Sequence, residues 1–296
     1  MVDYLKYLTI SVVAFTLYII IVRSNRTIDD EVYSTVRSFY YSWNSCITRA
    51  LRSIRRDPNA LWDNIGRASE YCENYTEISH LQILEYPNRD ESKYHILPNN
   101  HNDFSTIVTI GVGHDIDAEK KIKQDLGNNS AFYGADPIPD INAKLFESIG
   151  IFYPFAISGK SGYSQASVLD INGHYSPKDV IQVDLIYFLK EIIEPSLLLY
   201  DNLWIDAEGG EYSMMPLFYR GGRLDQNNIT VCQFNMEVHS PNELQKKNFR
   251  DFIDQILLDE RYAFTKLSSV AGHWRMYFIN MDNDVCSRKY LVKITV

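Results

Sequence analysis

The chain has 296 residues, of which 45% are hydrophobic, and no repeated or low-complexity segment, so we predict one catalytic-sized domain with an appendage. Its formal net charge is −9 at pH 7, with the lysines and arginines scattered along the chain. Because phosphate binding needs a concentrated basic surface, this charge argues against a nucleic-acid partner.

The first predicted element is an uncharged apolar stretch, YLTISVVAFTLYIIIV, over residues 7–22, with Lys6 before it and Arg23 after it. A helix of this length spans about 24 Å, which is short for a bilayer core of about 30 Å but sufficient with its flanking residues. No small-residue cleavage site follows the stretch. Residues 1–26 are therefore interpreted as an uncleaved transmembrane signal-anchor and not as a signal peptide.

Sequence features disagree about the side of the membrane on which the rest of the chain lies. Arg23 and Arg26 favour a cytosolic body, because positive charges flanking a span tend to stay inside. Four Asn-x-Ser/Thr sequons favour the lumen, and the four cysteines could form two disulfides or remain buried thiols. We predict a single-pass membrane glycoprotein whose catalytic body lies in the lumen of the secretory pathway. The sequons are at Asn25, Asn74, Asn128 and Asn228.

A helical hairpin is predicted after the anchor. Apolar side chains recur every three or four residues over residues 32–54, which places them on one stripe of a long helix. Asp57 is a typical N-cap, and Pro58 a typical first residue, of a second helix that packs back on the first. In such a hairpin Cys46 and Cys72 could meet.

Residues 78–102 are polar and are predicted to be a linker that completes an N-terminal segment of residues 27–102. Three histidines in the linker lack the regular spacing of a metal site, and we expect them on the surface. They are His80, His95 and His101.

From residue 103 to residue 296, strand-like apolar runs alternate with helical patterns, which is typical of βαβ units. The sequence therefore predicts an α/β domain with a doubly wound, mostly parallel sheet of about seven strands and an antiparallel last strand. The predicted strands are Ser105–Ile110, Ala131–Ala135, Gly150–Ile157, Tyr163–Leu169, Leu203–Ile205, Thr230–Val238, Tyr262–Leu267 and Trp274–Ile279. The predicted helices are Asp117–Asp125, Asp140–Ser148, Asp184–Glu194, Ser213–Tyr219 and Pro241–Leu258.

A glycine turn follows the first predicted strand of this domain, in the stretch TIVTIGVGHDIDAE of residues 106–119. Gly111 and Gly113 would let a cofactor approach the backbone, and Asp136, at the end of the next strand, would accept hydrogen bonds from ribose hydroxyls. Both NAD and S-adenosylmethionine bind in this geometry. A dehydrogenase is disfavoured because a third glycine and an obvious hydride-transfer acid–base pair are missing.

Four segments together resemble the successive motifs of FkbM-type methyltransferases, over about residues 103–240. This resemblance implies a Rossmann-like class I methyltransferase fold and S-adenosylmethionine as the cofactor for methylating a hydroxyl. The most specific segment is Asp-Ala-Glu-Gly-Gly-Glu, and the four are Thr106–Glu119, Phe132–Pro137, Asp206–Glu211 and Glu237–His239.

Carried over by position, the resemblance implies that Gly111 and Gly113 line the methionine side of the cofactor and that Asp136 binds its ribose. Asp206 and Glu208 would form the floor where methyl transfer occurs.

The glycine turn departs from the family pattern at two positions. Thr109 stands where an acid normally holds the cofactor's amino group, and Asp115 stands where a third glycine is usual. Either Asp115 supplies the missing charge or cofactor binding is weakened. A catalytically inactive binding module with this fold is therefore one alternative function.

Three side chains are candidates for the catalytic base that takes the acceptor's proton. His239 follows a strand end, and its unperturbed pKa of about 6.5 suits proton uptake; a structural histidine is the other interpretation. Asp206 and Glu208 would be negative near a cationic sulfonium, which is a favourable pairing. Glu211 is interpreted as a helix first-turn acid. We expect no metal ligands.

A second alternative function rests on Asp115-Ile-Asp117, which has the Asp-x-Asp form of lumenal, metal-dependent glycosyltransferases. Asp117 is also a good helix N-cap, and the short motif arises easily by chance. We therefore predict a membrane-anchored, S-adenosylmethionine-dependent O-methyltransferase that acts on a small-molecule or glycan hydroxyl.

Overall fold

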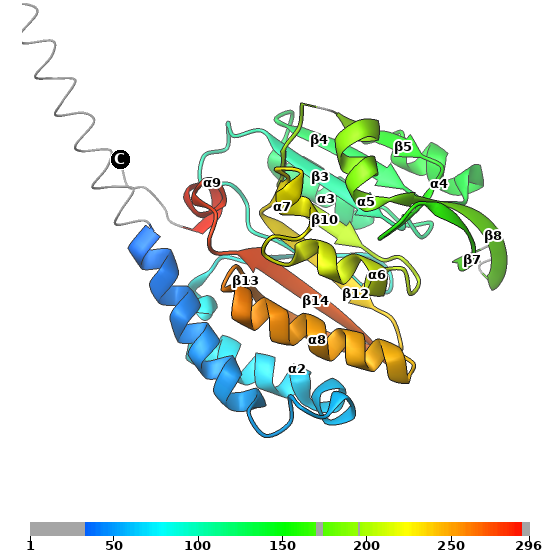
Figure 1. Cartoon of the computed structure of the whole chain (residues 1–296). Coiled ribbons are helices and arrows are strands. Elements are labelled where there is room, and N and C mark those ends of the chain that lie inside the picture. The colour runs from blue at the N-terminus through cyan, green and yellow to red at the C-terminus, as the bar shows by residue number, and fades with distance from the viewer. Residues whose placement is uncertain (1–32, 170–173, 195, 292–296) are drawn as a thin grey trace, which may run out of the picture.

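The computed structural model describes residues 33–169, 174–194 and 196–291, and a sheet of seven strands lies at its centre (Figure 1). The strand order is β13-β14-β12-β10-β3-β4-β5, with every neighbouring pair parallel except those that involve β14. This confirms the predicted mixed α/β fold and its antiparallel last strand. The strands are β3 (Ser105–Ile110), β4 (Ser130–Ala135), β5 (Ile151–Tyr153), β10 (Asn202–Ile205), β12 (Gln233–Val238), β13 (Tyr262–Val270) and β14 (His273–Asn280).

The central strands are buried on both faces because helices cover both sides of the sheet. Every residue of β3, β10 and β12 is buried, as expected for parallel strands between two helical layers. Alternate residues enter different cores: Ile107 and Trp204 pack with α3 and α4, whereas Val108 and Leu203 pack in the larger core with α8. These helices are α3 (Asp117–Leu126), α4 (Pro139–Phe146) and α8 (Glu243–Asp259).

The predicted helical hairpin is present and packs on the β13 edge of the sheet. A helix over residues 33–51 leads to α2 (Pro58–Tyr75), which lies beside α8 (Figure 1). Trp43 packs edge-on against Phe264 of β13, with the ring centroids 5.0 Å apart. Asp57 caps α2 as predicted, accepting hydrogen bonds from two backbone N–H groups of its first turn.

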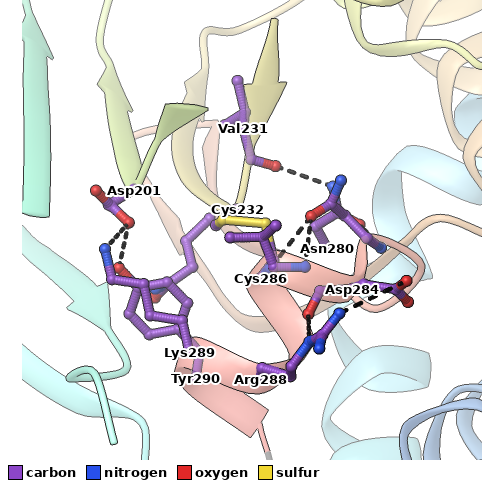
Figure 2. Close-up of a disulfide and its surroundings, with 12 residues drawn as sticks. Asp201, Val231, Cys232, Asn280, Asp284, Cys286, Arg288, Lys289 and Tyr290 are labelled. Atoms are coloured by element: carbon purple, nitrogen blue, oxygen red, sulfur yellow. Dashed lines mark hydrogen bonds and ion pairs between the residues drawn. A yellow bond between two sulfur atoms is a disulfide. The ribbon is translucent and has the colours of Figure 1, made fainter. Parts of the chain in front are cut away.

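All four cysteines are paired in the structure. Cys46–Cys72 joins the two helices of the hairpin, and Cys232–Cys286 joins the chain just before β12 to α9 (Asp284–Cys286). Figure 2 shows the second disulfide beside Asp201, which accepts hydrogen bonds from Lys289 and Tyr290. These contacts hold the last described turn against the start of β10, at the opposite end of the sheet from the glycine turn.

Two regions differ from the prediction. The predicted linker contains the hairpin β1 (Leu84–Pro87) and β2 (Ser92–His95), which is fastened to β12: Asn235 accepts a hydrogen bond from the Tyr94 N–H at 2.7 Å, and Gln233 from the Ile96 N–H at 2.8 Å. As a result His95 is fully buried, and its predicted surface position is wrong. His80 and His101 are exposed as predicted.

The predicted strand Tyr163–Leu169 does not join the main sheet. It belongs to a separate sheet of three strands, in the order β6-β8-β7, whose β7–β8 hairpin extends from one end of the molecule (Figure 1). The predicted strand Gly150–Ile157 is divided in the structure between β5 and the first strand of this separate sheet. The three strands of the separate sheet are β6 (Ala156–Ser158), β7 (Gly162–Leu169) and β8 (Tyr175–Asp184).

The remaining elements are short and lie mostly between strands. They are η1 (Glu77–His80), α5 (Leu185–Tyr187), η2 (Phe188–Ile193), β9 (Leu199–Tyr200), α6 (Glu211–Met214), η3 (Met215–Phe218), α7 (Arg223–Gln226), β11 (Thr230–Val231) and η4 (Ser287–Leu291).

The predicted membrane anchor requires a correction. Within the described residues, every helix is too short or too polar to cross a bilayer. Residues 7–22, on which the prediction depended, lie outside the described part of the chain. The predicted transmembrane signal-anchor and the single-pass membrane location with a lumenal body are therefore not supported, and we withdraw them.

Candidate active site

The candidate site lies at the carboxyl ends of four parallel strands. β4 and β5 extend the sheet on one side of β3, and β10 and β12 extend it on the other, so the strand order reverses between β3 and β10. Doubly wound folds bind ligands at such a point, beyond the strand ends. We call the residues that follow β3 and β4 the glycine side, and those that follow β10 and β12 the histidine side.

The two glycines of the glycine side have different roles. Gly111 has φ +84°, and an added Cβ would lie 2.0 Å from the backbone oxygen of Asp206, so only glycine allows this close approach of β3 and β10. Gly113 has φ +61°, but an added Cβ would meet no described atom within 4 Å. Gly113 therefore faces open space that a ligand can occupy.

Asp136 lies where the sequence predicted, directly after β4, and holds the glycine turn. One carboxylate oxygen accepts a hydrogen bond from the Val112 N–H at 3.0 Å, and the other from the Ile138 N–H at 2.8 Å. A carboxylate has about four lone-pair sites. Asp136 can therefore bind this backbone and still accept hydrogen bonds from a ligand hydroxyl.

Asp115 is engaged at the start of α3. Its two carboxylate oxygens accept hydrogen bonds from the N–H groups of Asp117 and Arg89, both at 2.9 Å. The candidate metal-binding groups found among the described residues do not include Asp115 or Asp117. The Asp-x-Asp interpretation therefore gains no support from the structure.

A buried carboxylate that the sequence reasoning missed lies beside Thr109. The Thr109 hydroxyl donates to Glu119 at 2.9 Å, and Lys93 lies 3.6 Å from the same oxygen. Burial raises the pKa of the fully buried Glu119, while the attraction of Lys93 opposes this shift. Glu119 thus brings a carboxylate next to the position of the missing family acid. The available signal was its place on the apolar face of α3, three residues before Ile122.

On the histidine side, His239 lies among three carboxylates. Its Nε2 is 3.5 Å from Asp206 Oδ1 and 3.3 Å from Glu208 Oε2. Its Nδ1 is 3.2 Å from Glu211 Oε1, which also accepts the His239 backbone N–H at 2.8 Å. The structure therefore brings together all three predicted catalytic side chains, and it makes Glu211 a partner of His239 as well as a first-turn acid of α6.

The charges of this cluster shift its pKa values strongly. Burial opposes a charge on His239, but hydrogen bonds to Glu208 and Glu211, with the attraction of the carboxylates, raise its pKa to about 11. Burial, followed by repulsion from Glu91 and Glu237, raises the pKa of Asp206 well above its usual range. The unperturbed histidine pKa assumed from the sequence therefore does not hold in this environment.

An open pocket of about 210 Å³ lies beside the cluster. This volume is smaller than the roughly 300 Å³ at which ligand pockets usually begin, so it suits the reacting end of an acceptor. Arg275 is bound to Glu237 at 2.8 Å, and the rings of His239 and His273 are 4.6 Å apart. The sequence reasoning missed the residues that β1–β2 and β14 contribute. The lining residues are Asp90, Glu91, Asp206, Glu208, Glu237, His239, His273 and Arg275.

A family model described as "Methyltransferase FkbM domain" matches residues 58–266, more than half of the chain. This match confirms the family inferred from the motifs and S-adenosylmethionine as the cofactor. An uncharacterized Caenorhabditis elegans protein, C28H8.7, is 21% identical over 267 residues, covering 88% of this chain and 83% of the relative.

The chain also resembles solved methyltransferase structures. Aeropyrum pernix fibrillarin in complex with S-adenosylmethionine has a TM-score of 0.36 and 10% identity, covering 60% of this chain and 68% of that one. M. capricolum TrmK in complex with S-adenosylhomocysteine has a TM-score of 0.33 and 13% identity, covering 62% and 64%. These likenesses are too low to carry an argument about function, which rests on the family match and on the site.

Proposed function

We propose that this chain, which belongs to the FkbM methyltransferase domain family, transfers the methyl group of S-adenosylmethionine to a neutral hydroxyl of a small molecule or glycan. The proposal rests on one observation, the arrangement of groups at the carboxyl ends of the strands. There the open glycine turn, held by Asp136, lies at the same edge of the sheet as the carboxylate-rich pocket.

The glycine side suits the cofactor. The methionine part would lie against the open face of Gly113, and Asp136 would accept hydrogen bonds from the ribose hydroxyls. Asp115 holds the loop through two backbone N–H groups, and Glu119 places a carboxylate under the turn, beside the position of the missing family acid. This buried carboxylate argues against the inactive binding module, which was motivated by the threonine at position 109.

The histidine side suits methyl transfer. A sulfonium is already a strong electrophile, so the protein must align the acceptor oxygen with the methyl group and take up its proton. The carboxylate of Glu208 favours a cationic cofactor beside it, and the cofactor's charge would in turn favour the ionised form of Asp206. Bound S-adenosylmethionine would supply the methyl group and leave as S-adenosylhomocysteine, and Glu208 would take up the proton of the acceptor hydroxyl. His239, oriented by Glu211, holds the two carboxylates in place.

The acidic lining of the pocket supports a neutral acceptor. Five of its eight lining residues are aspartate or glutamate, and its single arginine is paired with Glu237. An acceptor with phosphate or carboxylate next to the reacting hydroxyl would be repelled, whereas a sugar or alcohol hydroxyl would find hydrogen-bond acceptors. This is also why we propose no nucleic-acid acceptor.

The test is calorimetric titration of the whole chain with S-adenosylmethionine and S-adenosylhomocysteine. Both should bind, and Asp136→Ala should weaken the binding at least about tenfold, a loss of about 1.4 kcal/mol. The matched control is Asp140→Ala, which removes an exposed carboxylate from α4 and should leave the affinity unchanged.

Two results would contradict the proposal. A folded chain that binds neither ligand would favour the non-catalytic module, and binding only of UDP with manganese would favour sugar transfer. If the cofactor binds, transfer of a radiolabelled methyl group should be detected with neutral polyols or glycans and be weaker with their phosphorylated counterparts.

A further inference from the structure

We infer that Asp206, Glu208 and His239 form a binding site for one divalent cation that accepts both nitrogen and oxygen ligands, such as Mn²⁺ or Zn²⁺. These side chains come from the ends of two neighbouring strands, β10 and β12. Their ligand atoms all lie within 4.8 Å of one another.

Two spacings between these atoms, those from His239 to each carboxylate, match the spacing of ligands around a shared metal ion. Bonds of about 2.0–2.2 Å from a metal to imidazole nitrogen or carboxylate oxygen place neighbouring ligand atoms about 2.8–3.6 Å apart, for octahedral or tetrahedral geometry. The two distances from His239 Nε2, 3.5 Å to Asp206 and 3.3 Å to Glu208, fall in this range.

A proton on His239 accounts less well for the same geometry. Charge-assisted hydrogen bonds between nitrogen and carboxylate are about 2.7–2.9 Å long, and one N–H group that is shared by two carboxylates cannot point straight at both. In the described part of the chain, Asp206 Oδ1 is buried and has no hydrogen-bond partner, although the side chain keeps 28% of its surface exposed. That oxygen faces Nε2, where a cation would bind it.

The surroundings of His239 are those of a metal ligand. A ligating histidine usually donates its second ring N–H to a carboxylate, which fixes the ring and its tautomer. Glu211 provides that carboxylate: it is fully buried, lies 3.2 Å from Nδ1, and also accepts the N–H groups of His239 and Gly209. Glu211 therefore acts as a positioning residue that turns Nε2 toward the two carboxylates.

A second possible group of ligands, Glu237, His239 and His273, is less suitable. Glu237 is already paired with Arg275 at 2.8 Å, and the Nδ1 of His273 accepts the Ser240 N–H at 3.0 Å. A cation bound by these side chains would compete with the arginine. His273 and Glu237 therefore line the pocket without being ligands in this inference.

A cation at this point would deepen the proposed function, on which this part of the inference rests. It would offset the excess of carboxylates around the pocket, and a free coordination position would hold the acceptor hydroxyl and favour its deprotonated form. The metal site itself rests on the geometry alone.

The test uses the whole chain after removal of metal with a chelator, titrated with Mn²⁺ and followed by electron paramagnetic resonance of the free ion. One equivalent should bind, and the pulsed spectrum of the bound ion should show coupling to a histidine nitrogen. Asp206→Asn and His239→Gln should abolish stoichiometric binding, and His239→Gln should remove the nitrogen coupling. Glu211→Gln should weaken binding about 10–100-fold while the coupling remains.

The matched control is His273→Asn, which removes no metal ligand. It should change the affinity for Mn²⁺ less than about threefold, which is about 0.7 kcal/mol of binding free energy. Thermal unfolding would verify that each variant is folded. The inference is overturned if the folded natural chain binds no equivalent of Mn²⁺, or if His239→Gln binds it as well as the natural chain does.

Binding of S-adenosylhomocysteine to the metal-free chain separates this inference from the proposed function. The residues proposed to bind S-adenosylhomocysteine lie on the glycine side and need no cation, so the affinity for S-adenosylhomocysteine should persist without metal. Retained cofactor binding without a metal site would remove only the inference made here, whereas a metal site without cofactor binding would remove the proposed function.

Discussion

The glycine side and the histidine side of the site are built in different ways. The glycine side is formed by backbone: two glycines at positive φ, and a carboxylate whose two oxygens already hold N–H groups of the turn. The histidine side is formed by charged side chains whose carboxylates surround one imidazole. The first is held by backbone hydrogen bonds, whereas the second has more carboxylates than cations, an excess that a bound cation would offset.

This difference follows from where the residues lie in the chain. The glycine side comes from residues 109–136, which run from the end of β3 through α3 to the residue after β4. The histidine side and its pocket combine β10, β12, β14 and the β1–β2 hairpin, so that Glu91 and Arg275 line one cavity. If the proposed roles hold, the cofactor is bound by backbone that is local in the chain, whereas the acceptor is selected by segments that are distant in the chain.

The largest effect is expected at Lys93, which connects the two sides: it pairs with Glu119 under the glycine turn and lines a cavity with Asp206. Lys93→Met would leave the fully buried carboxylate of Glu119 without its cation, which should lower the free energy of unfolding by about 3–5 kcal/mol in urea titrations. Adding Glu119→Gln should restore most of this loss. A single variant as stable as the natural chain would show that the pair does not join the two sides.

The next effect separates the two glycines. Gly111→Ala should cost about 3 kcal/mol of stability, because its methyl group would meet the Asp206 backbone oxygen at a strained φ. Gly113→Ala, with open space around it, should cost only about 1 kcal/mol for its φ. Gly113→Ala should nevertheless weaken S-adenosylhomocysteine binding about tenfold in calorimetry. Unchanged binding in a folded Gly113→Ala variant would show that the cofactor does not lie against this turn.

A third prediction concerns His95, which contacts Asn202 at the start of β10, away from the candidate site. Its protonation should make the free energy of unfolding depend on pH. Burial, and then the charge of Lys289, lower the pKa of His95 from 6.5 to about 3. Between these values the unfolded chain binds a proton that the folded chain does not, so stability falls as the pH decreases. The free energy of unfolding should lose about 2 kcal/mol from this residue between pH 7 and pH 5.

Urea unfolding of His95→Asn should lack this part of the pH dependence, while His80→Asn, which replaces an exposed histidine, should keep it. Equal pH dependence in both variants would contradict a buried, neutral His95.

The smallest effect is expected at Asp115, whose oxygens already accept two backbone N–H groups. Asp115→Ala should cost about 1 kcal/mol of stability, as the loss of a helix cap does, and reduce cofactor affinity less than about fivefold. Asp117→Ala, which removes a half-exposed carboxylate from the same turn, is the control. A tenfold loss in Asp115→Ala alone would show that Asp115 replaces the missing family acid.

The doubly wound class of the fold and the position of the glycine side could be predicted because both depend on local chemistry. Alternation of β-branched runs with helical stripes predicted β3, β4 and β10 within a residue or two and the end of β12, and parallel strands necessarily place their carboxyl ends at one edge. That rule alone brought Asp136, Asp206 and His239 to the same edge. The separate sheet of β6, β7 and β8 was not predictable, because a strand pattern does not specify its partner.

By itself, the sequence determined the family, the α/β class of the fold and the glycine turn between β3 and α3, since periodicity, glycine stereochemistry and short motifs act over a few residues. Only the tertiary structure decided which charges are buried and which meet. The β1–β2 hairpin is held by the side-chain amides of Asn235 and Gln233, and no local pattern predicts contacts across about 140 residues. Those contacts bury His95 and Lys93 and bring the hairpin to the pocket, where long-range packing sets the charge around His239.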